Sequence, residues 1–366
     1  MKVLITAGQV YGRLDANKLV GNRTRGIWAV RFAEYLLKEG HEVVLVVSDI
    51  MDREFTYQLE MSYPAKIDIL RHDGFWKYKE ICEEMAPKVD AAVMASAVVN
   101  WIPETPFPGK MPITSKKMSI NFILAPKVIN KMKKINPKLA LIGCKMLIGS
   151  EYPELINAAH RVIMASKANL VLANDMKNGL KTKYLVYQDK SVFVYENDFQ
   201  ALYEAMKQTI EDKHYSTNIV DLKDEPDEDL EFFKGLIQTH KNDFIHPSEN
   251  NDIIFGAVAV KSKSGWIITG RGKSFETIFE DYGIVKNIDY EKGVVDVSRK
   301  KVSLNAPLMI KVGEQFGAKY VVHFHTKLPY TPIAPYAPPG TFRDNNRDIP
   351  GPVFNIEGHG YIKALK

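Results

Sequence analysis

Three histidines near the end of the chain are the residues best suited to chemistry. His323 and His325 close the apolar run 320–322, and His359 follows between two glycines. Side chains two positions apart on a strand point to the same face, so the first two imidazoles can reach one ion. Three protein ligands with an open fourth position are typical of a catalytic zinc site. The spacing therefore predicts a Zn²⁺ site; the alternative is two buried strand histidines and a loop histidine.

A second suitable group follows the first apolar run. The turn 6–8 ends a predicted strand, and open parallel sheets bind their ligands at this carboxyl edge. Arg23 and Arg25 lie just before a helix predicted to begin at Ile27. Backbone amides at a helix start, with two guanidinium groups beside them, attract phosphate or carboxylate. We predict an anion site here; the alternative is an ordinary solvated turn.

Both groups need a sheet to position them. In the first part of the chain, apolar runs of strand length alternate with helical patterns. Strands are predicted over 3–5, 43–47, 91–95, 139–142 and 169–173, and helices over 27–38 and 199–210. Such alternation predicts an α/β fold, with a Rossmann-like parallel sheet covered on both faces.

The second part of the chain has a different texture. With 366 residues, two domains are expected. Residues 221–231 carry seven acidic side chains and a proline, a stretch that repels itself and predicts a linker. Strands and turns predominate beyond it, which predicts a mixed α/β domain. We therefore expect a nucleotide-binding domain over 1–213, an acidic linker over 214–231 and a metal-binding domain over 232–366.

Composition narrows the class of protein. The net charge of +5 is small and the basic residues are scattered, so we expect small-molecule substrates and no nucleic-acid partner. No apolar run approaches the ~20 residues of a membrane helix, and the chain leads directly into a strand, so neither a membrane span nor a signal peptide is expected. Cys82 and Cys144 form no metal or redox motif, which fits the cytoplasm.

Several ordered motifs in residues 1–213 resemble the phosphopantothenate–cysteine ligase (phosphopantothenoylcysteine synthetase) family. The run 3–40 is similar to its signature of a T-A-G turn, D-x₆-N-x-[ST]-x-G and a helix ending before G-H-E-V. The run 90–98 is similar to the family's D-A-V-I-M-A-A-A-V strand end, and residues 173–175 match its A-N-D. The resemblance implies a parallel-sheet fold and a ligase.

The family joins a carboxylate to an amine. Its members attach the α-phosphate of CTP, or of ATP in some, to the acid, and the amine of cysteine then displaces the nucleotide. By resemblance, Asn22 would hold the acyl intermediate and Lys110 would neutralise charge on the triphosphate, with Mg²⁺ accompanying it. The resemblance places Gly8, Ala95, Ala97, Asn174 and Asp175 at the nucleotide, and Arg23 and Arg25 at a substrate phosphate or carboxylate.

Some positions depart from the family pattern. Its G-G-T turn is Gly8-Gln9-Val10 here, Asn100 stands where many members have aspartate, and Leu147 replaces a glutamate. These positions face substrate in the family. Which acid and which amine are joined therefore stays open.

The region from residue 232 onward resembles the class II aldolase/adducin family. Residues 256–260 and 266–272 are similar to its G-N-[IL]-S-V strand and L-I-T-P-S-G turn, and residues 318–325 and 358–360 match its A-V-V-H-T-H and N-H-G. The resemblance implies that His323, His325 and His359 bind Zn²⁺, which polarises a carbonyl beside a forming carbanion. Arg271 and Lys273 of the turn would contact a substrate phosphate or carboxylate; the alternative is a solvated turn.

One departure concerns proton transfer in this second region. Asn305 stands at the position of the family's acid/base glutamate, and an amide cannot act as a general base. The metal would then serve isomerisation, dehydration or decarboxylation, or hold the domain together.

The leading hypothesis is a bifunctional cytoplasmic enzyme, a CTP-dependent ligase fused to a zinc-dependent lyase. One alternative is an N-terminal dinucleotide-binding oxidoreductase. Against it, the first turn lacks G-x-G-x-x-G, and Asp49 is the only supporting acid. Another is a ligase domain with an adducin-like C-terminal module that only binds partners. Both resemblances imply a homo-oligomer.

Overall fold

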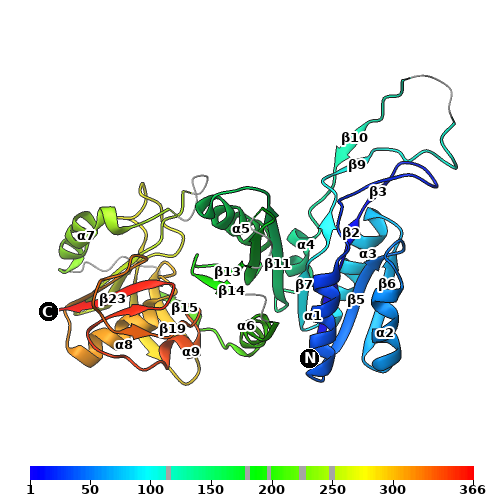
Figure 1. The fold of residues 1–366 in the computed structure, drawn as a ribbon. Helices are drawn as coiled ribbons and strands as arrows, with labels where there is room; N and C mark the ends of the chain where they lie inside the picture. The colour runs from blue at the N-terminus through cyan, green and yellow to red at the C-terminus, as the bar shows by residue number, and fades with distance from the viewer. Residues whose placement is uncertain (113–116, 178–181, 196–198, 222–227, 247–251) are drawn as a thin grey trace. The chain divides into compact units, whose positions relative to one another are not determined.

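The chain divides into two compact units. The computed structural model describes residues 1–112, 117–177, 182–195, 199–221, 228–246 and 252–366 (Figure 1). The first unit comprises residues 1–188 and 194–210, and the second comprises residues 189–193 and 211–366. None of the helices in these described ranges is long and apolar enough to cross a membrane.

The first unit is built on an eight-stranded sheet with the order β14-β13-β12-β11-β7-β1-β5-β6. Its strands are β1 (Lys2–Thr6), β5 (Glu42–Ser48), β6 (Ile67–His72), β7 (Ala91–Met94), β11 (Ala140–Leu147), β12 (Leu170–Asp175), β13 (Lys183–Tyr187) and β14 (Val192–Tyr195). From β6 to β12 neighbouring strands are parallel, and β13 is antiparallel to β12. The strand order reverses at β1, which places a crevice beyond the carboxyl ends of β1 and β7.

Helices cover both faces of this sheet. They are α1 (Ile27–Lys38), α2 (Glu54–Ser62), α3 (Phe75–Met85), α4 (Ile129–Ile135), α5 (Tyr152–Ser166) and α6 (Phe199–Glu211), with a 3₁₀ turn at Ala86–Lys88. The side chains of Leu4, Val44 and Val46 pack with α3 and α4 in one core. Val43 and Leu45, which alternate with these residues along β5, point to the opposite face. They are equally buried, because α1 lies against β5 on that side. The expected Rossmann-like parallel sheet is therefore confirmed.

Short strand pairs extend from the carboxyl edge. β2 (Gln9–Val10) pairs with β8 (Ala97–Val98), and β3 (Gly12–Arg13) pairs with β4 (Leu19–Val20). β9 (Trp101–Pro103) and β10 (Phe122–Leu124) form an antiparallel arm that projects from the first unit (Figure 1). All three residues of β10 are exposed, whereas Ile102 and Pro103 of β9 are buried, so within the described chain it is the β10 strand of the arm that is left uncovered.

The second unit is built on a nine-stranded sheet with the order β15-β19-β18-β17-β16-β20-β23-β22-β21. Its elements are β15 (Ser216–Asp221), α7 (Leu230–Thr239), η2 (Lys241–Asp243), β16 (Ala257–Ser262), β17 (Gly265–Thr269), β18 (Tyr282–Asp289), β19 (Val294–Arg299), α8 (Ala306–Phe316), β20 (Tyr320–Phe324), β21 (Ile333–Ala334), α9 (Phe342–Asn345), β22 (Val353–Ile356) and β23 (Gly360–Leu365). Most pairings are antiparallel, whereas β15–β19 and β21–β22 are parallel. One core forms with α8 on one face, and another with α7 on the opposite face.

The structure differs from the expected linker over 214–231. Residues 216–221 form β15, which pairs with β19 inside the second sheet. The β-branched residues Thr217, Ile219 and Val220 suit a strand, and this tendency outweighs the acidic composition that begins at 221. The acidic stretch also contains the start of α7, where negative charge is favourable. Its central residues, 222–227, lie outside the described ranges.

Candidate functional sites

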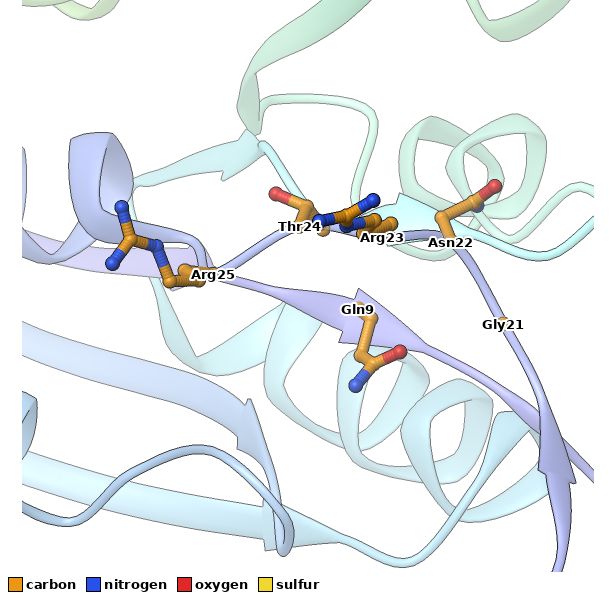
Figure 2. A pocket seen from close by; sticks show the side chains of 6 residues that line it. All are labelled: Gln9, Gly21, Asn22, Arg23, Thr24 and Arg25. Carbon is orange, nitrogen blue, oxygen red and sulfur yellow. The ribbon is translucent and has the colours of Figure 1, made fainter.

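A pocket of about 670 Å³ lies beyond the end of β1 in the first unit. Figure 2 shows the side chains that line it, which come from β2 and from the loop that precedes α1. They are Gln9, Gly21, Asn22, Arg23, Thr24 and Arg25. The pocket is therefore at the carboxyl edge of the parallel sheet, where the sequence predicts an anion site.

Two glycines let this loop close over the end of β1. Gly8 and Gly26 have φ values of 79° and 73°, in the left-handed region that glycine enters without strain. A Cβ atom on Gly26 would lie 2.3 Å from the backbone nitrogen of Gly8. A larger residue at 26 would therefore push the loop away from β1. Among the residues that the structure describes, no side chain caps the start of α1, so its first amides remain available to a ligand.

Asn22 connects the loop to the segment after β7. Its Nδ2 donates to the carbonyl of Ala97 (3.1 Å), and the amide of Ala97 donates to the carbonyl of Gly8 (2.9 Å). Ala95 is half-buried in the same segment. The structure thus brings together four residues that the sequence assigned to one site, although they lie up to about 90 positions apart in the chain.

Arg23 and Arg25 supply positive charge at this edge. Both side chains are exposed, and neither guanidinium has a hydrogen-bond or ion-pair partner in the described part of the chain. Two such cations next to the start of a helix attract an anion more strongly than either feature alone.

Lys110 is not among the residues that line the pocket, but its loop is fixed on both sides. Gly109 accepts a hydrogen bond from the amide of Ala16 (2.9 Å), and the amide of Met111 donates to the buried carboxylate of Asp15 (2.9 Å). Bonds from Met111 and Asn17 hold the pKa of Asp15 well below its usual range. Asp15, the aspartate of the D-x₆-N pattern, is therefore a positioning residue that the sequence did not identify as such. Lys110 itself is exposed.

Asp175 ties the loop after β11 to the end of β12. Its carboxylate accepts hydrogen bonds from the amide of Gly149 (3.0 Å), from the amide and hydroxyl of Ser150 (2.9 and 2.8 Å) and from the amide of Lys177 (2.8 Å). These bonds, led by the one from Ser150, lower the pKa of Asp175 to about 2. A carboxylate engaged in this way fixes the shape of the loop that it holds. Asn174 is half-buried near the end of β12, and its contact with a nucleotide stays a prediction.

A basic group at the end of β11 has no counterpart in the sequence predictions. Burial, followed by the nearby charges of Lys127 and Arg161, lowers the pKa of the half-buried Lys145. Lys127 also donates to the side-chain oxygen of Asn100 (2.8 Å). The three cations come from separate elements, so no local pattern could have linked them.

Asp49, the acid that supported a dinucleotide site, has another partner. The hydroxyl of Tyr11 donates to its carboxylate over 2.5 Å. This bond occupies one of the carboxylate oxygens that would contact the ribose if the first unit bound a dinucleotide.

The three histidines of the second unit converge. His323 is on β20, His325 follows that strand, and His359 lies in the turn between β22 and β23. Their ligand atoms all lie within 4.8 Å of one another. The ring centroids are 5.1 Å apart for 323–325, 4.8 Å for 323–359 and 4.5 Å for 325–359. The period-2 expectation therefore agrees with the arrangement of the rings.

The chemistry of this cluster suits a metal ion. The buried Nε2 atoms of His323 and His359 have no hydrogen-bond partner in the described ranges, a costly state unless a ligand occupies them. Burial and the neighbouring imidazoles lower the pKa values of His323 and His325 well below the usual value, so both are neutral at pH 7. Neutral imidazole is the form that binds zinc. Nitrogens on one tetrahedral zinc would be about 3.4 Å apart, closer than the 4.8 Å within which the ligand atoms lie here.

Three further residues of the second unit were singled out from the sequence, and they differ in how exposed they are. Lys273 is buried and its Nζ donates to the carbonyl of Gly256 (2.5 Å); burial lowers its pKa to about 7. Its charge contributes, after burial and His359, to the low pKa of His325. Arg271 is exposed beside a cavity of about 10 Å³, too small for a substrate. Asn305 precedes α8, and its buried Oδ1 has no partner in the described residues.

Comparisons with known proteins concern the first part of the chain. Residues 1–220 match the family model of the DNA/pantothenate metabolism flavoprotein C-terminal domain. The chain is 26% identical over 176 residues to the coenzyme A biosynthesis bifunctional protein CoaBC of Thermococcus kodakarensis, covering 48% of this chain and 41% of that protein. It is 25% identical over 175 residues to the protein of the same name from Methanocaldococcus jannaschii, covering 48% and 40%. The chain thus spans about two fifths of the length of these relatives.

A solved structure supports the fold of the same region. The DNA/pantothenate metabolism flavoprotein from Streptococcus pneumoniae superposes with a TM-score of 0.50 at 18% identity, covering 57% of this chain and 98% of that one. The family match ends at residue 220, within β15.

Proposed function

Because the chain belongs to the DNA/pantothenate metabolism flavoprotein C-terminal domain family, we propose that its first unit is a carboxylate–amine ligase of the phosphopantothenate–cysteine ligase type. One observation carries the proposal: Asn22 is bonded to Ala97 beside two exposed arginines at the uncapped start of α1. The names of the two archaeal relatives, which refer to coenzyme A biosynthesis, point to the same reaction.

The proposed reaction has two steps. An oxygen of the substrate carboxylate attacks the α-phosphorus of CTP or ATP, the bond to the β-phosphate oxygen breaks, and pyrophosphate leaves with Mg²⁺. The amine then attacks the acyl carbon, the nucleoside monophosphate leaves with the electrons of the acyl–oxygen bond, and the amine proton passes to solvent. The product is an amide.

The residues of the first unit divide this work by charge. Arg23 and Arg25 would hold the phosphate or carboxylate of the acid, because they are exposed cations next to the helix start. Asn22 would hold the acyl intermediate through its amide. Lys110 would approach the triphosphate from its anchored loop and offset the charge that builds on the leaving group. Backbone groups of Gly8, Ala95, Ala97 and Asn174 would surround the nucleotide.

Pyrophosphate release tests the ligase. The purified chain would be incubated with Mg²⁺, 4′-phosphopantothenate and cysteine, with CTP in one arm and ATP in the other. Release that needs both co-substrates supports the proposal and identifies the nucleotide. Folded protein that is silent in both arms would contradict this acid and amine. The turn at 8–10, which departs from the family pattern, would then be the place to search for other substrates.

We also propose that the ligase unit forms a homo-oligomer through the β9–β10 arm. The arm exposes large apolar side chains that a single copy leaves in water, and such patches mark interfaces. They are Trp101, Phe107, Phe122, Ile123 and Leu124. Sedimentation velocity of the full chain and of Leu124→Asp would test this: the variant is expected to shift toward monomer, and an unchanged profile would exclude the arm.

A second candidate function concerns the second unit, because its histidines converge with free ligand atoms. We propose that it binds Zn²⁺ through His323, His325 and His359 and acts as a lyase on a small phosphorylated or carboxylated metabolite. A bound zinc would polarise a substrate carbonyl and stabilise charge on the adjacent carbon. Lys273 would add positive charge nearby, whereas Asn305 leaves proton transfer to another group. Stoichiometric zinc in the purified protein would support this proposal, and absence of zinc after reconstitution would remove it.

A further inference from the structure

The turn between β13 and β14 contacts the histidine cluster. Residues 189–193 group with the second unit, and Oδ2 of Asp189 lies 3.0 Å from Nδ1 of His359. The Asp189 side chain is only 12% exposed and that of His359 only 1%. The two atoms are in close contact, although the ring N–H is not aligned for a linear hydrogen bond. A carboxylate beside His359 is therefore held almost out of water.

Asp189 is itself held by several groups. The amide and hydroxyl of Ser191 donate to Oδ1 (3.0 and 2.5 Å), and the hydroxyl of Tyr336 donates to Oδ2 (2.9 Å). The orientation of the carboxylate is thus fixed by groups other than the histidine.

Packing holds the two turns together. A Cβ atom on Gly358 would lie 3.2 Å from the ring of Phe193, and Phe193 contacts Tyr336 with ring centroids 5.1 Å apart. The turn that carries His359 therefore lies directly against residues 189–193. These apolar contacts place Asp189 beside His359 without relying on the charge.

We propose that Asp189 is the positioning residue of the metal site, and that it holds His359 with Nδ1 protonated and Nε2 directed at the ion. This inference rests on the proposed zinc site. A metal-bound histidine usually donates a hydrogen bond from its second ring N–H to a carboxylate or a carbonyl. This bond fixes the tautomer of the ring and raises the basicity of the nitrogen that binds the metal. His323 follows the same arrangement, because its Nδ1 lies 2.9 Å from the carbonyl oxygen of Tyr361. Asp189 would accept the hydrogen bond from Nδ1 of His359, as the carbonyl oxygen of Tyr361 does for Nδ1 of His323.

The proposal has a consequence for the chain as a whole. Asp189 lies within the span 1–220 that matches the ligase family, whereas the three histidines lie beyond it. The metal site would then depend on a turn from the family-matched part. Because coupling is reciprocal, metal binding would also stabilise residues 189–193.

Metal affinity of Asp189→Asn in the full chain tests the proposal. Zn²⁺ affinity would be measured by competition with a chromogenic chelator, and coordination by the visible absorption of the Co²⁺ form. We expect affinity to fall about 10- to 100-fold, the usual effect of losing such a partner, and Asp189→Glu to recover part of it. Asp212→Asn is a matched control, because it removes a buried carboxylate paired with Arg343 in the same unit without touching a histidine.

A second measurement separates positioning from folding. In the wild type, Zn²⁺ should slow hydrogen exchange at the Ser191 amide, which donates to Asp189, and this protection should vanish in His325→Ala. Tyr336→Phe, which leaves Asp189 in place, should weaken Zn²⁺ binding by only a few-fold. Wild-type affinity in Asp189→Asn, with zinc bound normally by the parent, would overturn the positioning role alone. Failure of the parent to bind Zn²⁺ or Co²⁺ would remove the metal site and this inference with it.

Discussion

In the first unit the groups proposed to meet substrate are exposed cations on a loop, whereas in the second they are imidazoles gathered at the end of a sheet strand. Arg23 and Arg25 are exposed to solvent, and their loop is shaped by glycine backbone and by Asn22. His323 and His325 are kept neutral by burial and by the neighbouring His359. A site for a transient anion needs accessible charge, and a site for a resident metal needs neutral ligands in a dry setting.

Each unit also contains carboxylates that act through other residues. Asp15 and Asp175 are saturated by backbone amides and shape loops around the pocket. Asp189 has the same kind of support from Ser191 but faces an imidazole. Asp15 and Asp175 should therefore stay unchanged when the first site is tested, because replacing them would alter the loops as well as the site.

The largest effect is expected from replacing Lys110, and it should be confined to the first unit. Lys110→Ala should lower kcat for pyrophosphate release by about 10²- to 10³-fold, because one preorganised contribution to charge stabilisation is lost. Zinc content should be unchanged. Turnover and metal analysis on the same preparation check both statements. Normal turnover would exclude Lys110 from the reaction.

Replacing His325 should have the opposite pattern, with metal binding lost and turnover kept. His325→Ala should weaken Zn²⁺ binding by about 100-fold or more, beyond the usual effect of a partner behind the ligand. Pyrophosphate release should remain at the wild-type rate, since no contact of the proposed ligase site in the described ranges includes this ring. Dialysis against buffered Zn²⁺ followed by metal analysis gives the affinity. Undiminished zinc would discard the ligand assignment.

A smaller effect is expected from the arginines of the loop. Arg23→Ala and Arg25→Ala should each raise KM for the acid substrate by about tenfold, near the value of one charge-assisted hydrogen bond. The loss should shrink as salt is added, because both side chains are exposed. Steady-state kinetics at low and high ionic strength check this; Lys177→Ala, outside the pocket, serves as the control. A change confined to kcat would contradict a binding role.

A separate effect, on stability rather than on activity, concerns a buried cation of the second unit. The pKa of Lys273 is lowered to about 7 by burial, whereas the unfolded chain has a value of about 10.4. Between these values the unfolded state binds one more proton, so the free energy of unfolding should rise with pH by about 1.4 kcal/mol per unit. Denaturant unfolding from pH 7 to 10 should show this slope, relative to Lys273→Met. Parallel curves for both proteins would contradict the shifted pKa.

Much of the fold follows from local pattern. The continuous apolar runs and their alternation with helices predict the parallel sheet, and it forms because its central strands are covered on both faces. The strand β15 was missed, since its six residues adjoin the acidic stretch and gain stability only by pairing with β19, more than 70 positions away. The arm β9–β10 was also absent from the predictions, as its short strands show no clear periodicity.

Residue types and local spacing determined by themselves what each site could do. The step of two between His323 and His325 places both rings on one face, and the glycines around Arg23 and Arg25 allow a loop at a helix start. Only the tertiary structure decided which distant groups complete the sites. Asp189 reaches His359 across 170 positions, and Asp15 anchors Met111 across 96. Such contacts depend on how separate elements pack, and chain packing leaves no periodic trace in the sequence around either partner.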